Sequence, residues 1–474
     1  FKKILIANRG EIALRVIRTC KRLGIATVAV YSDADVHSMH VTEADETIAI
    51  GGYTPRESYL VMEKILNAIA VSGADAVHPG YGFLSENEVF AKKVAEAGCV
   101  FIGPTPDAIN ALGDKTAARE LAITNSVPVA PGSDGAIEGY EPIRELAATI
   151  GYPVMIKAAA GGGGKGMRAV FSEEELRDGL AAAQGEALTS FNDARVFVER
   201  YIQNPRHIEI QVLADNHGNV LYFPERECSI QRRHQKVIEE SPSTAVTPEI
   251  RKAMGEAGAR LVRASKYTNA GTIEFLLDTD GSFYFMEVNT RLQVEHPVTE
   301  MISGVDFVEQ QIRIAAGLPL EITQSDIQEP KGHAIECRIC AEDVFSGFLP
   351  DTGVVEYLNL PEGDGIRNDS GLYVGYEVSV HYDPMVAKLI VHAENRAVAM
   401  QRTVDALKNY GLSGFRTTIP FCIQVIESEQ FQSGDYSTKY VERHWHDSSV
   451  GRNAEALSAI AALVYDDYST RRTA

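Results

Sequence analysis

The first 110 residues alternate short apolar runs with stretches whose apolar side chains recur at helical spacing. An apolar run at 3–8 leads into a helical pattern that stops at Gly24, and a second run occupies 26–31. Further runs at 74–78 and 100–103 continue the alternation. Successive strands joined through helices pair in parallel, because each helix returns the chain to the same end of the sheet. The pattern therefore predicts a parallel α/β unit at the start of the chain.

The turn after the first predicted strand, Asn8-Arg9-Gly10-Glu11, invites comparison with dinucleotide-binding turns, and Asp33 lies at the end of the second predicted strand, just after residue 31. Such a turn needs three spaced glycines so that the backbone can approach a pyrophosphate closely. Only Gly10 lies at this turn, and Glu11 and Ile12 would crowd the pyrophosphate. The sequence therefore disfavours NAD binding.

A different organisation follows the α/β unit. Pro128, Pro131 and Gly132 interrupt the alternation, and a small unit with a strand at 154–157 and a helix at 173–184 comes next. Beyond residue 204 the pattern becomes rich in antiparallel strands. The expected strands and helix of this region are 208–213, 220–223, 272–277 and 283–288, further strands within 347–375, and a helix at 396–408. Residues 446–453 read as a linker before a C-terminal helix at 454–465.

Composition limits the partners of the chain. Its formal net charge is −20, which makes it a poor general partner for nucleic acid or anionic membranes. No apolar run approaches the roughly 20 residues of a membrane span, and no secretory signal is visible, so we expect a cytoplasmic protein. Cys337 and Cys340 lack a second ligand pair at zinc-binding spacing and are interpreted as buried free thiols.

The run Gly161-Gly162-Gly163-Gly164-Lys165-Gly166 follows a predicted strand that ends in Lys157. Successive glycines let backbone N–H groups approach phosphate oxygens. Taken alone, such a run can also be a plain flexible connector. Its place between a strand that ends in lysine and a helix favours a phosphate-covering loop.

A hairpin at 272–289 carries the most informative local pattern. Asp280-Gly281 predicts a two-residue type I′ turn, which would place Glu274 directly opposite Glu287. Two facing carboxylates repel each other unless a cation lies between them. Asn289 lies two residues beyond Glu287 on the same face, and this set of hard oxygen ligands suits Mg²⁺ or Mn²⁺. The alternative is a solvent-facing hairpin with incidental acids.

The residues beyond this hairpin suggest an anion site. If the strand continues in extended form, Arg291, Gln293 and Glu295 share a face with Asn289. A cation, an amide and a carboxylate in a row could bind a small oxyanion and remove its proton. The basic cluster at 232–236, taken alone, is more typical of a solvated loop.

Taken together, these features resemble the biotin carboxylases of the ATP-grasp family. The resemblance covers about residues 2–445 and is carried by segments 6–13, 78–87 and 287–297. It implies mixed α/β and α+β architecture: a Rossmann-like N-terminal domain (1–113), an ATP-grasp domain (114–330) with a mobile lid (130–203), and an antiparallel β-rich C-terminal domain (331–445). Residues 446–474 would be the linker and final helix.

The resemblance also implies roles for individual residues. Those expected to bind ATP are Lys115, Lys157, Gly163, Gly164, Glu199, Arg200, Tyr201, Ile202, His207, Gln231, His234 and Leu276. Glu274, Glu287 and Asn289 would hold two divalent metal ions, and the bicarbonate site would comprise Lys236, Arg291, Gln293, Val294 and Glu295. Tyr81, Arg338 and Asp383 would lie near biotin. The catalytic residues would be Arg291, Glu295, Lys236 and Arg338. Lys439 stands where a histidine is expected at the edge of the nucleotide pocket.

The activity implied is carboxylation of carrier-bound biotin from ATP and bicarbonate through carboxyphosphate. No Ala-Met-Lys-Met carrier lysine occurs, so we expect the biotin carrier and a carboxyltransferase on separate polypeptides, and a homodimer or larger oligomer. The helix at 454–465, with Leu457, Ile460, Ala461 and Val464 on one stripe, could equally dock a partner or pack on its own domain. The final acceptor could be acetyl-CoA, propionyl-CoA or pyruvate. Alternatives are another ATP-grasp carboxylate ligase and a non-catalytic nucleotide-binding module.

Overall fold

The computed structural model describes residues 1–159, 166–445 and 465. The predicted N-terminal alternation forms a five-stranded parallel sheet in the order β3-β2-β1-β4-β5. Its strands are β1 (Lys3–Ile6), β2 (Ala26–Tyr31), β3 (Glu46–Ala49), β4 (Ala76–His78) and β5 (Val100–Phe101). The helices of this region are α1 (Gly10–Arg22), α2 (Met39–Glu43), α3 (Met62–Ser72), α4 (Glu88–Glu96), α5 (Pro106–Gly113) and α6 (Lys115–Thr124).

Helix α1 shows why the opening sequence folds as it does. Gly10, at φ +65°, begins the helix after a three-residue turn that follows β1, and its left-handed backbone favours glycine. Its apolar stripe, with Ile12, Val16 and Ile17, is buried against the sheet in one cluster with Ile4. Helical spacing of these residues was enough to predict the element.

A nine-stranded antiparallel sheet forms the centre of the molecule, in the order β14-β13-β9-β11-β12-β15-β20-β19, with β10 pairing β9. Its strands are β9 (Arg206–Ala214), β10 (Val220–Tyr222), β11 (Arg226–Arg232), β12 (Gln235–Ser241), β13 (Asn269–Leu277), β14 (Phe283–Asn289), β15 (His333–Cys340), β19 (Ile366–Ser370) and β20 (Met385–Ala393). Helices α9 (Pro248–Ala264), α10 (His296–Ser303), α11 (Phe307–Ala315) and α12 (Gln324–Ile327) belong to the same half of the chain.

This central sheet crosses the boundary expected near residue 330. Strand β12 pairs with β15 through four partner positions, from Ile238 with Cys337 to Ser241 with Ala334. Shorter strands lie beyond: β16 (Glu342–Asp343), β17 (Leu349–Pro350), β18 (Tyr357–Asn359) and β21 (Gly411–Ser413). The helices at this end are α13 (Arg396–Lys408), α14 (Ile419–Glu427), α15 (Glu429–Ser433) and α16 (Tyr440–His444). Side chains from both halves can therefore meet on one continuous face.

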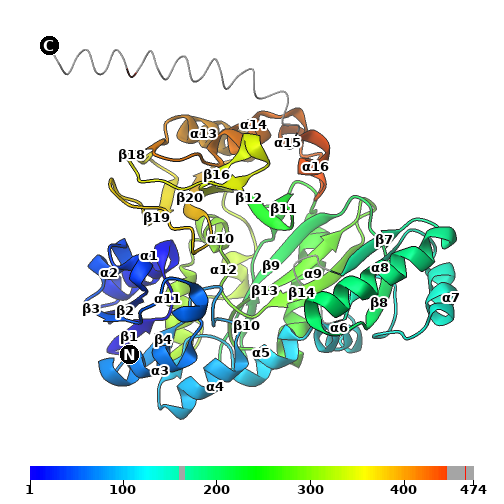
Figure 1. The fold of residues 1–474 in the computed structure, drawn as a ribbon, viewed down its shortest axis with the longest axis horizontal. Helices are drawn as coiled ribbons and strands as arrows, with labels where there is room; N and C mark the ends of the chain where they lie inside the picture. Colours follow the sequence, from blue (N-terminus) through cyan, green and yellow to red (C-terminus); the bar gives the residue numbers. More distant parts are fainter. Residues whose placement is uncertain (160–165, 446–464, 466–474) are drawn as a thin grey trace.

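A separate three-stranded sheet lies to one side of the molecule, far from the N-terminal sheet (Figure 1). It contains β6 (Val154–Ala158), β7 (Met167–Val170) and β8 (Val196–Arg200), with α7 (Tyr140–Ile150) and α8 (Glu173–Phe191) packed on it. Pro131 O accepts from Arg200 N at 2.7 Å, and Ser133 N donates to Val198 O at 2.8 Å. Pro131-Gly132 is therefore bound to this small sheet.

The expected architecture of a parallel N-terminal sheet followed by antiparallel sheets is confirmed. The glycine loop at 161–165 and the stripe from Leu457 to Val464 lie outside the described residues. Within the described ranges, no helix combines the length and apolar character needed to cross a bilayer.

Candidate active site

The β13–β14 hairpin reaches the expected pairing by an unexpected route. The predicted two-residue turn at Asp280-Gly281 is wrong, because Leu277 pairs with Phe283 and five residues, 278–282, form the connection. A β-bulge then inserts Met286 as an extra residue between the pairs Phe275–Phe285 and Glu274–Glu287. The prediction that Glu274 faces Glu287 is confirmed, and the bulge is the reason.

These residues fit a divalent cation by the chemistry of their donors. Asn289 pairs with Thr272, two positions beyond Glu287, so two carboxylates and an amide gather on one face of the hairpin. Lys115 Nζ lies 2.7 Å from Glu287 Oε2, which brings a phosphate-binding candidate to the same place. Hard oxygen ligands beside cations that can bind phosphate are suited to Mg²⁺ or Mn²⁺.

A second bulge aims the side chains of β12. Gln231 pairs with Lys236 and Ile230 with Ile238, which leaves Val237 as an extra residue. Val237 and Ile238 both enter the apolar core. Lys236 and Glu239 consequently both contact residues of the site, although alternation alone would place them on opposite faces.

Glu295 lies between two cations from these strands. Lys236 Nζ is 2.6 Å from Glu295 Oε1, and Arg338 Nη2 is 2.9 Å from Glu295 Oε2. Burial alone would raise the pKa of Glu295, but Lys236 and Arg338 hold this pKa well below its usual range. The carboxylate is thus ionised at neutral pH and can accept a proton once a bound anion weakens its contacts with these cations.

The same lysine reaches two further carboxylates. Lys236 Nζ lies 2.6 Å from Glu209 Oε2 and 2.8 Å from Glu274 Oε1. Burial acts against the charge on Lys236, but these carboxylates raise its pKa well above the usual value. Lys236 is therefore a permanent cation at the centre of the site.

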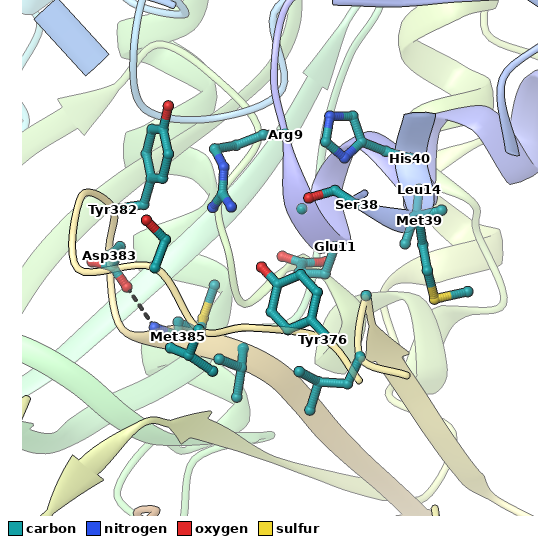
Figure 2. Close-up of a pocket in the computed structure, with 16 residues that line it drawn as sticks. Arg9, Glu11, Leu14, Ser38, Met39, His40, Tyr376, Tyr382, Asp383 and Met385 are labelled. Carbon is teal, nitrogen blue, oxygen red and sulfur yellow. Dashed lines mark hydrogen bonds between the residues drawn. The ribbon is translucent and has the colours of Figure 1, made fainter. Parts of the chain in front are cut away.

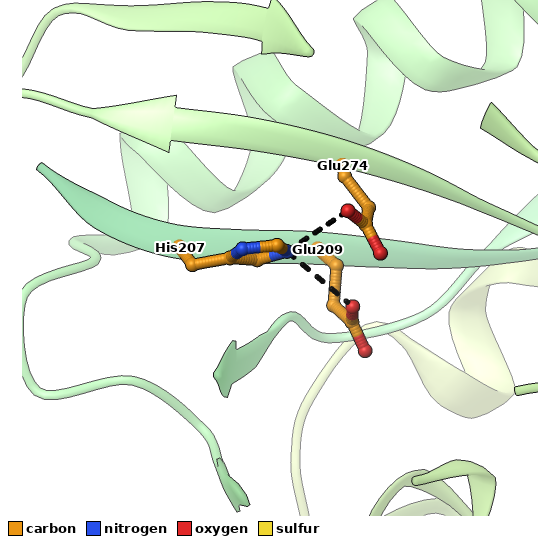
Figure 3. Close-up of side chains that lie close together, drawn as sticks. All are labelled: His207, Glu209 and Glu274. Atoms are coloured by element: carbon orange, nitrogen blue, oxygen red, sulfur yellow. Dashed lines mark ion pairs between the residues drawn. The ribbon is translucent and has the colours of Figure 1, made fainter. Parts of the chain in front are cut away.

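His207, Glu209 and Glu274 cluster on β9 and β13 (Figure 3). Gln231 Nε2 lies 2.9 Å from His207 Nδ1; an amide nitrogen can only donate, so Nδ1 accepts and Nε2 carries the hydrogen. His207 Nε2 lies 3.1 Å from Glu274 Oε2. Burial would raise the pKa of Glu274, but Lys236 and His207 hold it well below its usual range.

Arg226 fixes the orientation of Gln293 from beneath the site. This fully buried guanidinium donates to Gln293 Oε1 at 3.0 Å and also binds Glu209. The Gln293 amide nitrogen then donates to Glu274 Oε1 at 2.9 Å. Gln293 is locked into one rotamer by these two contacts.

Arg291 reaches the site differently from the expectation. Strand β14 ends at Asn289, so the predicted extended continuation to Glu295 is wrong, and the chain turns before α10. Pro297 lies in the first turn of α10, where its missing N–H costs no helical hydrogen bond. Arg291 Nη2 donates to Asn289 Oδ1 at 3.0 Å, and Glu86 Oε2 accepts from Arg291 Nε at 2.8 Å.

The nucleotide candidates lie along the small sheet and its junction. Lys157 contacts Glu199 across the β6–β8 pair. Ile202 is buried, Arg200 is exposed, and Lys439 Nζ lies 5.0 Å from the centre of the Tyr201 ring. Leu276 pairs with His207. His234 is at the exposed tip of the β11–β12 turn, where Arg233 and His234 both have positive φ.

The candidate biotin residues border the junction of the N-terminal and C-terminal sheets. Tyr81 OH donates to Glu11 Oε1. Glu11 and Asp383 line the same small cavity, of about 30 Å³, together with Arg9 and Tyr382 (Figure 2). Val294 O accepts from the buried Lys388 Nζ at 2.7 Å. Of this group, Arg338 is the one that contacts Glu295 directly.

Sequence reasoning missed three acidic residues of the site. Glu209 and Glu239 bind Lys236 and Arg338, and Glu86 binds Arg291. Glu209 carried a usable signal, because His207, Glu209 and Gln211 alternate with isoleucine and valine along one predicted strand. Nothing in the local pattern around Glu239 revealed the bulge that turns it toward the site.

Family models match nearly the whole chain. A model described as "Biotin carboxylase, N-terminal domain" matches residues 1–109, "Carbamoyl-phosphate synthase L chain, ATP binding domain" matches 114–323, and "Biotin carboxylase C-terminal domain" matches 336–443. The biotin carboxylase of Haemophilus influenzae is 52% identical over 93% of this chain and 98% of its own length.

A longer relative and a solved structure are also similar. The mitochondrial propionyl-CoA carboxylase alpha chain of Mus musculus is 50% identical over 98% of this chain, which spans only 65% of that relative. The biotin carboxylase domain dimer of the Hydrogenobacter thermophilus 2-oxoglutarate carboxylase, solved with MgADP, ADP and bicarbonate, has a TM-score of 0.89 and 48% identity, covering 94% of this chain and 98% of that one. The chain belongs to the biotin carboxylase family.

Proposed function

We propose that this chain uses ATP and bicarbonate to carboxylate biotin presented by a carrier protein. The observation that carries the proposal is the buried carboxylate of Glu295 held between Lys236 and Arg338. Family membership and bicarbonate and MgADP in the Hydrogenobacter relative support the choice of substrates. A carboxylate between two fixed cations is suited to binding a small oxyanion and removing its proton.

In the first step, Glu295 accepts the bicarbonate proton. Lys236 and Arg291 bind the anion, with Gln293 and the Val294 backbone orienting it. Bicarbonate competes with Glu295 for the Lys236 ammonium, so binding raises the proton affinity of the Glu295 carboxylate when it is needed. The low pKa of Glu295 without substrate keeps this base ionised beforehand.

In the second step, the deprotonated oxyanion attacks the γ-phosphate of ATP to give carboxyphosphate and ADP. Lys115 and Lys157 compensate phosphate charge, with the glycine loop at 161–166, including Gly163 and Gly164, closing over it. Mg²⁺ or Mn²⁺ held by Glu274, Glu287 and Asn289 would neutralise further phosphate charge when bound. Glu199, Arg200, Tyr201, Ile202, His207, Gln231, His234 and Leu276 would surround the rest of the nucleotide.

In the third step, carboxyphosphate breaks down to CO₂ and phosphate, and phosphate takes the ureido proton of biotin. Arg338 stabilises the enolate-like biotin oxygen, beside Tyr81 and Asp383. The ureido nitrogen then attacks CO₂. Arg338 meets this developing negative charge as a preorganised guanidinium.

The proposal also includes the domain boundaries, the partners, the oligomeric state and the location of the chain. The domains are 1–113, 114–330 with a lid at 130–203, and 331–445. The partners are a biotin carboxyl carrier and a carboxyltransferase, and the chain forms a homodimer, as the Hydrogenobacter relative does, or a larger oligomer. A cytoplasmic location stays a prediction, since the relatives include mitochondrial chains as well as bacterial biotin carboxylases.

Labelled bicarbonate fixation tests the activity. Purified protein with ATP and Mg²⁺ should carboxylate free biotin weakly, and a biotinylated carrier more strongly. NAD should have no effect. ATP hydrolysis that depends on an amine or acyl acceptor and not on biotin would favour another ATP-grasp ligase. Binding of ATP without any bicarbonate-dependent hydrolysis would favour a non-catalytic module.

A further inference from the structure

Two buried glutamates lie side by side next to Arg338, and the proposed reaction uses neither. Glu239 on β12 and Glu336 on β15 are direct partners in the antiparallel pairing. Side chains at such positions leave the same face of the sheet, with Cβ atoms about 5 Å apart. Both residues have an exposed fraction of 0%. Two carboxyl groups therefore share one dry region.

Hydrogen bonding in this region is incomplete. Glu239 Oε1 accepts from Arg338 Nε at 2.6 Å. Over the described ranges, neither Oε2 of Glu239 nor either oxygen of Glu336 has a hydrogen-bond partner. Two ionised carboxylates in this position, with three oxygens lacking donors, would be strongly unfavourable.

The neighbouring cations do not remove the problem. Lys388 is on β20 opposite Arg338, but its ammonium donates to Val294 O and lies 3.5 Å from Glu11 Oε1. Arg338 divides its contacts between Glu239 and Glu295. Helix α10 packs over this face with His296, whose pKa burial holds well below its usual value, and with Glu300, which pairs with Arg15 and Arg367.

A single proton between the two carboxyls resolves this arrangement. It gives Glu239 Oε2 a donor and removes one of the two adjacent charges. Burial raises the pKa of Glu239 to about 7 against the influence of Arg338. Burial and the charge on Glu239 raise the pKa of Glu336 well above its usual range, although Lys388 acts in the opposite direction.

We propose that Glu336 is a positioning residue for the biotin step. Glu336 shares one proton with Glu239, so that Glu239 can hold Arg338 in place without fully neutralising the charge of the guanidinium. This inference rests on the proposed function, because Arg338 meets biotin only in that reaction. With two negative charges beside it, Arg338 would be drawn away from the biotin oxygen. With a neutral pair, Arg338 would lose its anchor.

Two substitutions of Glu336 distinguish a role in sharing a proton from a role in packing alone. Glu336→Gln keeps the shape and a donor toward Glu239 but cannot ionise, whereas Glu336→Leu removes the donor. At pH 8 we expect kcat/KM for free biotin within about threefold of wild type for Gln and lower by about tenfold or more for Leu, as for loss of a hydrogen bond to a charged group. The Gln variant should also keep its activity to higher pH than wild type.

The KM values for ATP and bicarbonate in biotin-independent ATP hydrolysis should change little in both Glu336 variants.

Glu240→Gln is the matched control. Glu240 is the next residue on β12, is equally buried, and is bound on the opposite face by His333 and Arg396. It should lower thermal stability without changing the ratio of biotin-dependent to biotin-independent hydrolysis. Equal kcat/KM for biotin in the Gln and Leu variants would overturn the proposal.

Infrared spectroscopy tests the proton itself, independently of activity. Wild-type protein in ²H₂O at pH 8 should show protonated-carboxyl absorption that decreases by one group in Glu336→Gln. An undiminished band overturns the proposal, even if the Leu variant does not fold. Failure of the wild type to hydrolyse ATP in response to biotin would instead count against the proposed function, and the infrared result would still decide whether the proton is shared.

Discussion

Lys236 Nζ lies within 2.8 Å of carboxylate oxygens from Glu295, Glu274 and Glu209, which come from three separate segments of the chain. The candidate base and a candidate metal ligand are thus held by one buried ammonium. Any substrate that binds Lys236 changes the environment of both carboxylates at once.

Glu295→Gln should abolish bicarbonate-dependent ATP cleavage and leave ATP binding intact. The amide cannot accept the bicarbonate proton, and loss of a general base lowers turnover by about 10²- to 10⁴-fold. Hydrolysis measured with and without bicarbonate, alongside ATP affinity by calorimetry, checks this. Near-normal turnover would mean that another group is the base.

Glu287→Gln should raise the Mg²⁺ concentration for half-maximal activity by about tenfold or more, since even the outer partners of metal ligands are worth 10–100-fold in affinity. Asp280→Asn, in the exposed turn of the same hairpin, is the matched control. Metal titrations of ATP hydrolysis give the comparison. A wild-type metal requirement in Glu287→Gln would remove this residue from the metal site.

Glu86→Gln should raise the KM for bicarbonate by about three- to tenfold, because Arg291 loses the charged partner that holds its guanidinium. The KM for ATP should stay nearly constant. Glu88→Gln, two residues along the chain, is the control. An unchanged KM for bicarbonate would show that Arg291 is positioned by its other contacts alone.

The small sheet should close on ATP as a unit that begins after Ala130. Val129 pairs with Phe285 of the central sheet, whereas Gly132 pairs with Glu199 of the small sheet, so the hinge lies between these anchors. Hydrogen exchange with a non-hydrolysable ATP analogue should slow across 131–200 and change little at 127–129. If the hydrogen exchange and the protease sensitivity of the small sheet do not change when the nucleotide analogue is added, closure is contradicted.

Two buried histidines should make the fold acid-sensitive. Burial lowers the pKa of His40 and of His78 to about 4 from an unfolded value of 6.5. The unfolded chain therefore binds more protons below pH 6.5, and the free energy of unfolding should fall from there toward pH 4, by about 2 kcal/mol per histidine at pH 5. Urea unfolding at pH 7.5 and 5.0 measures this.

His78→Gln should reduce that pH dependence, whatever its effect on overall stability. His217→Gln, at a more exposed position that binds Gly317 O, should leave it unchanged. Identical slopes in His78→Gln and wild type would show that other groups cause the acid sensitivity.

Most helices and strands could be predicted from the sequence where one regular spacing of apolar residues, helical or alternating, extends over the whole element. Strand β2 and helix α13 have the predicted bounds, because one pattern of buried side chains extends along each element. The continuation of the central sheet from β12 into β15 was not accessible. Such a pairing joins residues about 100 positions apart and leaves no local trace.

The site residues could be predicted where the resemblance to a known family supplied them. They could not be predicted where the local backbone geometry decides which side chains face the site. Bulges at Met286 and Val237 each change which side chains face the site, and neither follows from propensity. Glu239 remained hidden for this reason. The Arg233-His234 turn was equally hidden, because neither residue is typical of a turn with two positive φ angles.

The bulge at Val237 has a consequence for protein engineering. Loss of Val237 itself would restore plain alternation and keep Lys236 and Glu239 on one face, whereas loss of any residue from Ile238 to Ser241, with the bulge kept, would send the side chains on one side of the deletion to the opposite face. Chimaeras between relatives should therefore have their crossover points outside 231–240. Deletion scanning of β12 should find loss of Val237 less harmful than loss of any residue from Ile238 to Ser241.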